Sequence, residues 1–152
     1  MSESHYSPDD IENKLESQRP GERRLGVIIA GKLRLYQLAR HIVSIMHHDS
    51  DSEVRAMAAW SLDMLGSPDT VPELIGAMYD GDFGVRSNAG WALVHMAKRI
   101  TPDLILPDVI DVLRDMSNPD ARQMAYLVLS RIGGEHAHDA IQCYWYNRRD
   151  NG

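Results

Sequence analysis

The sequence predicts an all-α fold, an α-solenoid of about four stacked helix pairs, on three observations. Apolar residues recur at helical spacing, and the alternation typical of strands is absent. Arg23, Arg55, Arg86 and Arg122 stand 32, 31 and 36 residues apart, and the same pattern follows each of them. The residues three, seven and ten positions after each arginine form one helical stripe: Gly26, Ala30 and Leu33; Ala58, Leu62 and Leu65; Ala89, Leu93 and Met96; Ala125, Leu129 and Ile132.

Capping residues and helix stops divide each repeat into two helices. Residues 51–52, Asp82 and 117–119 are suited to cap the first helices, and glycines follow two of these helices, at Gly66 and at 133–134. Thr70 to Glu73 has the form of a capping box and opens a second helix. Five extra residues around 98–102 predict a longer turn or a helix extension in the third unit. The last helix is expected to place Ala140, Ile141 and Tyr144 on its inner side.

These boundaries predict one repeat domain with short flanking segments. Residues 1–20 form an N-terminal extension in which 7–10 cap a short helix that carries Ile11 and Leu15. The repeat domain spans 21–146, with units of about 21–49, 50–80, 81–116 and 117–146. Residues 1–6 and 147–152 are expected to fray.

Length and charge narrow the class of protein. A chain of 152 residues with 43% apolar residues is enough for one continuous core. Its 22 acidic and 16 basic side chains give a net charge of −6, which disfavours nucleic-acid binding through a broad basic face. The only cysteine, Cys143, excludes an intrachain disulfide, so we expect a cytoplasmic protein. No apolar run is long enough to cross a membrane.

Residues 49–62 and 80–93 resemble short HEAT-like repeats, in the version also found in proteins related to phycobilisome lyases. The resemblance covers roughly residues 21 to 146 and implies an inter-repeat ladder in which an aspartate joins the arginine six positions later. Its residues here are Asp49 with Arg55 and Asp80 with Arg86; for Arg122, Met116 holds the aspartate's place. The same resemblance implies an alternative function, a bilin lyase or chaperone-like role.

The first helices are apolar on both sides. The residue five positions after each arginine lies about 200° round the helix from the core stripe, where a polar residue is expected. Instead, this outer stripe holds Ile28, Met57, Trp60, Met64, Trp91, His95, Met124 and Leu127. An exposed apolar row of this kind is typical of an interface, either with another protein or with a second copy in a homodimer. Alternatively, the N-terminal segment with Ile11 and Leu15 covers the row. A further alternative is that a drift in helical register turns Trp60 and Trp91 partly into the core.

The second helices carry a different face. Their outward positions are acidic and include Glu73, Asp108, Asp111 and Asp115. Such a face is usually only solvated; if it binds, its partner is basic and the contact weakens with salt.

Catalytic and metal-binding patterns are weak. The histidines of 47–48 and 136–138 form no four-ligand set, and the chain has no His-Glu dipeptide of the kind found in HEAT-like iron hydroxylases. Cys143 lies on an apolar-patterned helix and is expected to be buried and inert. We therefore expect no metal, no cofactor and no enzymatic activity, and interpret the chain as a scaffold-like module for protein–protein interaction.

Overall fold

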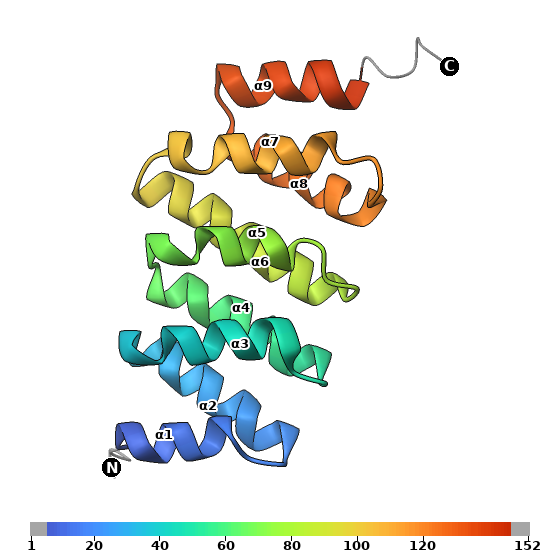
Figure 1. Ribbon diagram of the computed structural model, residues 1–152. Helices are drawn as coiled ribbons and strands as arrows, with labels where there is room; N and C mark the ends of the chain where they lie inside the picture. The colour runs from blue at the N-terminus through green and yellow to red at the C-terminus, as the bar shows by residue number, and fades with distance from the viewer. Residues whose placement is uncertain (1–5, 147–152) are drawn as a thin grey trace.

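The computed structural model describes residues 6–146, which form a stack of helix pairs without a strand within that range (Figure 1). The all-α prediction is confirmed. The α-helices are α1 (Pro8–Leu15), α2 (Pro20–Lys32), α3 (Ala39–His48), α4 (Ser52–Leu65), α5 (Val71–Ala77), α6 (Phe83–Arg99), α7 (Leu106–Arg114), α8 (Pro119–Ile132) and α9 (Glu135–Ile141). Three short 3₁₀ turns precede second helices, η1 (Tyr36–Leu38), η2 (Pro68–Thr70) and η3 (Pro102–Leu104), and a π-helical segment, η4 (Gln142–Tyr146), follows α9.

The helices form two layers. The first helices of the units, α2, α4, α6 and α8, pack directly on one another, whereas α3, α5, α7 and α9 pack mainly against first helices (Figure 1). The short helix predicted in the N-terminal extension is α1, which lies against α2. The extra residues of the third unit extend α6, which reaches Arg99 and has 17 residues against 14 in α4. The expected fraying of 147–152 concerns residues outside the described range.

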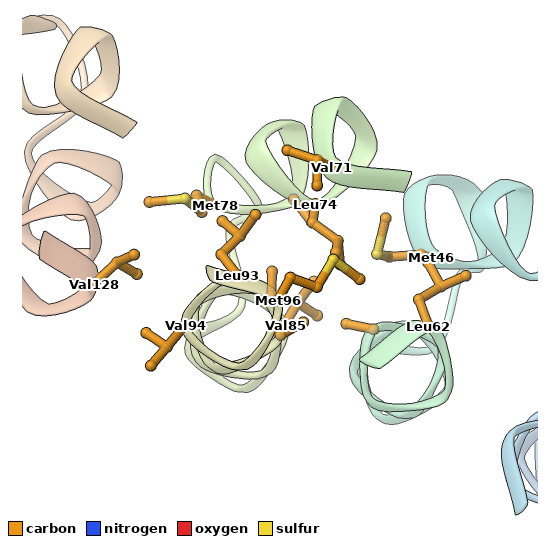
Figure 2. Close-up of a cluster of buried hydrophobic side chains, with 14 of the residues drawn as sticks. Met46, Leu62, Val71, Leu74, Met78, Val85, Leu93, Val94, Met96 and Val128 are labelled. Carbon is orange, nitrogen blue, oxygen red and sulfur yellow. The ribbon is translucent and has the colours of Figure 1, made fainter. Parts of the chain in front are cut away.

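The core lies between the two layers and runs through successive units. The predicted stripe supplies Leu62, Leu93 and Met96, which are fully buried. Met46 and Leu74 reach them from α3 and α5, so one cluster joins neighbouring repeats (Figure 2). An isolated helix pair would leave such side chains exposed, and stacking therefore supplies the burial that holds the fold.

Small residues let the first helices approach closely. A Cβ atom added to Gly31 of α2 would lie 2.8 Å from the Ser61 Oγ and 3.0 Å from the Ser61 Cα of α4. A Cβ atom added to Gly90 of α6 would lie 2.8 Å from the Met124 Sδ of α8. The backbones of neighbouring first helices therefore pack with no room for a side chain at these two points.

An arginine–aspartate ladder joins the units, with a pairing that differs from the expected one. Arg23 binds the Asp49 carboxylate through two hydrogen bonds of 2.7 and 3.0 Å, and Arg55 binds the Asp80 carboxylate through two of 3.0 and 3.2 Å. Arg55 reaches Asp49 only at its main-chain carbonyl, at 2.9 Å. The carboxylate thus pairs with the arginine of its own unit rather than with the arginine six positions later, because each aspartate lies in the turn beside the first helix of that unit.

The third unit lacks the arginine–aspartate fork. Arg86 is buried and donates to the carbonyls of Asp80 and Gly81, and its nearest carboxylate, that of Asp120, is 4.0 Å away. Met116 occupies the place of the missing aspartate and is exposed. Arg122 instead donates to the carbonyls of Leu113 and Tyr144.

The C-terminal end differs from expectation in two side chains. Tyr144 is exposed, and Trp145 packs against the core with its ring stacked on Tyr126 at 4.6 Å. Cys143 is also exposed rather than buried. Both differences have the same cause, because the π-helical turn adds a residue to the turn and shifts which side chain faces inward.

We predict that Gly31→Ala destabilises the chain although alanine favours a helix. The new methyl group meets the backbone of Ser61, and overpacking of this kind costs about 1–3 kcal/mol. Gly21→Ala is the matched control, since it lies in the same helix with nothing within 4 Å of the added atom. Urea unfolding of both variants measures the difference, and equal stabilities would contradict the close packing of α2 on α4.

We also predict that Asp49→Asn lowers stability at neutral pH by about 1–3 kcal/mol. Burial opposes the charge of Asp49, but hydrogen bonds from Arg23 and from the Asp51 N–H, with the nearby arginine charges, outweigh it and lower the pKa of Asp49. This stabilisation is present at neutral pH and is lost as the pH falls below the ordinary aspartate value of about 3.9, through the lowered pKa of the folded state.

The test of the Asp49 prediction is urea unfolding at pH 7 and pH 3. The difference in free energy of unfolding between the wild type and Asp49→Asn should be smaller at pH 3 than at pH 7. Asp69→Asn, which removes an exposed carboxylate, serves as the control and should change little at either pH. A difference that stays constant with pH would show that the carboxylate charge of Asp49 does not contribute.

Candidate interaction surface

The outer stripe of the first helices lies on the surface of the slab. Trp91 is 42% exposed and Leu127 is 40% exposed, while Trp60 and Ile28 are half-buried at the equivalent places on α4 and α2. Met57 and Met64 flank Trp60 and are also half-buried. Neither indole is enclosed in the core, so the row stays open to a partner.

The N-terminal helix does not cover this row. Ile11 and Leu15 of α1 are buried in the core, and Leu15 lies beside Gly26 of α2. Gly26 belongs to the core stripe, about 200° round α2 from the outer position of Ile28. The helix in the N-terminal extension therefore packs on the core side of α2, and it leaves the outer stripe of the first helices exposed.

A groove opens on this surface between α6 and α8. Its volume is about 220 Å³, and Gly90, Met124 and Val128 are among the residues that line it. Its rim carries Trp91, Leu127 and Phe83, of which Phe83 is the most exposed, at 63%. Met124 was expected to face a partner; it is instead buried, because it fills the space that Gly90 leaves.

Sequence reasoning missed Phe83 and Val94 as groove residues. Phe83 begins α6, one helical turn before the repeated stripe is recognisable, and its only signal is a large aromatic residue directly after a capping aspartate. Val94 stands beside His95, and only the position of α8 shows that it borders an opening.

The joint between α4 and α6 is bridged by polar side chains. The Asn88 amide donates to the Ala56 carbonyl at 2.8 Å. The buried Asp63 carboxylate lies 2.7 Å from His95 Nδ1 and 3.3 Å from the Arg99 Nη2 that donates to it. His95, expected to contact a partner, therefore holds two first helices together, and its ring also lies 5.7 Å from that of Trp91.

The acidic face of the second helices has its own internal bonds. Tyr79, two residues after the end of α5, donates to the Asp115 carboxylate at 2.9 Å, and burial together with this bond raises the pKa of Tyr79 to about 12. Hydrogen bonds from the Ser117 side chain and backbone, and from Tyr79, lower the pKa of Asp115. Glu73 lies 2.9 Å from a ring nitrogen of His47. Asp108 and Asp111 are exposed and line a shallow groove between α5 and α7 with Tyr79.

The family model described as HEAT repeats matches residues 39–117. The chain belongs to the HEAT-repeat family. The predicted family is thus confirmed, and the matched region runs from α3 to the end of the third unit.

A solved structure extends the likeness to most of this HEAT-repeat chain. It is a chain in the complex of CpcE and CpcF of phycocyanin lyase from Nostoc sp. PCC7120. The TM-score is 0.66 at 22% sequence identity, and the match covers 91% of this chain but only 56% of the other. This likeness is one of fold. A comparison with curated proteins found no match.

Within residues 6–146 of the HEAT repeats, no group of three or more His, Cys, Asp or Glu side chains is arranged to hold a metal ion. His47 and His48 meet only edge to face, with ring centres 6.1 Å apart, and His136 and His138 are exposed on α9. In the same part of the chain, every helix is too short or too polar to span a bilayer.

Proposed function

We propose that this HEAT-repeat chain is a non-catalytic protein-binding module that docks a partner protein on the outer face of its first helices. One observation carries the proposal: the groove between α6 and α8 opens beside two exposed, large apolar side chains, Trp91 and Phe83. Tryptophan at the centre of an apolar patch is typical of the residues that dominate binding energy at interfaces.

The extent of the row supports a protein partner. Ile28, Trp60, Trp91 and Leu127 occupy equivalent places on four consecutive first helices, which stack about 8–10 Å apart. A row of this length suits a protein surface rather than a small molecule. The fold likeness to a chain of the CpcE–CpcF complex also supports a partner protein, since that neighbour is part of a two-protein assembly.

The double variant Trp60→Ala with Trp91→Ala tests the proposal. We expect the chain purified from its native host to carry a stoichiometric partner, identified by mass spectrometry, and the double variant to lose it. The lost indoles at an interface centre should weaken binding by about 2 kcal/mol or more. Light scattering gives the mass of each complex, and circular dichroism checks that the helices are retained.

The matched control for the double variant is Tyr36→Ala with Leu104→Ala. Both side chains are large and more than half exposed, at 55% and 58%, but lie in the turns before second helices. This control should keep the partner. A wild-type chain that is monomeric and alone in its host, or a complex that both double variants retain, would refute the proposed surface.

A second candidate is a pigment-handling protein, in which the chain binds a bilin as part of a lyase or as a chaperone. The fold likeness to the phycocyanin lyase chain favours it, although the other chain is considerably longer. Binding of a linear tetrapyrrole would shift the pigment's visible absorption spectrum on titration. We expect a flat titration with this chain, and a saturable shift that Trp91→Ala abolishes would establish the pigment function instead.

A further inference from the structure

The charge pattern of the outer face indicates what kind of partner the groove takes. At the α4–α6 joint, Asp63 of α4 supplies a carboxylate that is only 4% exposed, and α6 supplies the cation and the ring that face it, Arg99 and His95. At this joint the carboxylate of Asp63 therefore has its partners, Arg99 and His95, within the chain.

The α6–α8 joint has a basic side chain, that of Arg131, but no carboxylate at the place equivalent to Asp63. Val94 replaces Asp63 at the equivalent place, and Arg131 replaces His95. The Arg131 guanidinium lies 5.0 Å from the centre of the Trp91 ring and borders the groove. In residues 6–146, no carboxylate lies within ion-pair distance of Arg131. Arg131 therefore offers two or more N–H donors to whatever enters the groove.

The surroundings of the groove are basic in an otherwise acidic chain. The exposed charges on the outer sides of the first helices are mainly cations; they are Arg24, Lys32, Lys98 and Arg131, against the carboxylates Glu53 and Asp120. The second helices and α1 carry most of the exposed acidic residues, in a chain of net charge −6. The two layers thus present opposite charges to solvent.

We infer that the α6–α8 groove docks an amphipathic helix of a partner protein whose apolar stripe is flanked by an acidic residue, and that Arg131 binds that carboxylate. This inference rests on the proposed function and adds the chemistry of the partner. The groove floor of Gly90, Met124 and Val128 receives an apolar side chain. The partner's carboxylate supplies at this joint the group that Asp63 supplies at the previous one.

The same features weigh against two other occupants. A second copy presenting the same face would bring like charges together, because Lys98 and Arg131 would approach their own counterparts. A nucleic acid would be attracted by the cations, but it would leave the apolar floor and the exposed Phe83 without apolar contacts.

The test selects, from a peptide library, the members that bind the chain of 152 residues. The library holds helical peptides of roughly 18 residues with a fixed leucine stripe and flanking positions randomised among Glu, Gln and Lys. We expect enriched peptides to carry glutamate at one flanking position. Replacing that glutamate by glutamine should weaken binding about tenfold, as measured by fluorescence anisotropy, because a charge-assisted hydrogen bond is lost.

Charge reversal identifies the partner of the peptide's glutamate. Arg131→Glu should weaken binding of the glutamate peptide about tenfold or more, and a Glu→Lys peptide should recover binding to that variant. Arg40→Glu is the matched control, since it makes the same change in net charge at an exposed site on α3. It should leave binding unchanged. Trp91→Ala should abolish binding of every selected peptide.

The remaining outcomes separate the inference from the proposed function. Peptides that need Trp91 but ignore Arg131→Glu would overturn the inference and leave the docking surface standing. No enrichment, or peptides indifferent to both substitutions, would overturn both. A dimer in sedimentation equilibrium that needs Trp91 and excludes the peptides would make a second copy the occupant. A DNA duplex that displaces the peptides and needs Arg131 would make it a nucleic acid, and either result would refute the inference.

Discussion

The arginine–aspartate fork at the turn between consecutive units is the interaction on which the rest of the slab depends. Each fork lies in the turn where a second helix gives way to the next first helix, and it joins the arginine near the start of a unit to the aspartate at the end of the same unit. Because Arg55 also binds the carbonyl of Asp49, one aspartate connects two arginines. The first helices pack directly on one another, whereas neighbouring second helices contact one another far less, through pairs such as His47 with Glu73 and Tyr79 with Asp115. The first helices therefore form a continuous wall whose outer side has no covering layer among the described residues.

The place where the ladder ends is also where the surface opens. Arg86 and Asp120 still approach to 4.0 Å, and Arg122 donates to the Leu113 carbonyl. However, Met116 supplies no carboxylate to Arg86 and Val94 supplies none to Arg131, so a bidentate fork and a bridge like that of Asp63 are both missing. Apolar contact through Gly90, Met124 and Val128 replaces them. Apolar packing has no directional requirement, and a hollow remains at the outer edge of this joint, whereas Asp63, His95 and Arg99 bridge the two helices at the previous one. The groove is thus a consequence of which residues the third and fourth units lack.

The repeat made the fold predictable, because four similar segments reinforce one helical register and one core stripe. The same repeat indicated the outer row, since Trp60 and Trp91 fall five positions after their arginines. The groove was not predictable, because it depends on residues such as Phe83 and Val94 that belong to no repeated pattern. Met124 shows why: its position in the repeat is an outer one, but the missing side chain at Gly90 draws it inward. The ladder pairing was missed for a related reason, since spacing along the chain cannot say whether an aspartate faces the arginine of its own unit or that of the next unit. At the last helix, a π-helical turn shifted the inward position from Tyr144 to Trp145, and periodicity assumes regular turns.

A chain of net charge −6 can attract an acidic partner because electrostatic forces act locally in salt solution. At physiological ionic strength the screening length is about 8 Å, similar to the distance between packed helices. Arg131, 5.0 Å from the ring centre of Trp91, lies well within that length of a ligand in the groove. The exposed carboxylates of the second helices lie across the thickness of the slab, so their repulsion is largely screened at the outer face. Separation of charge between the layers therefore lets the outer face orient an acidic helix while the apolar groove supplies the affinity, and it leaves the acidic layer free of that partner.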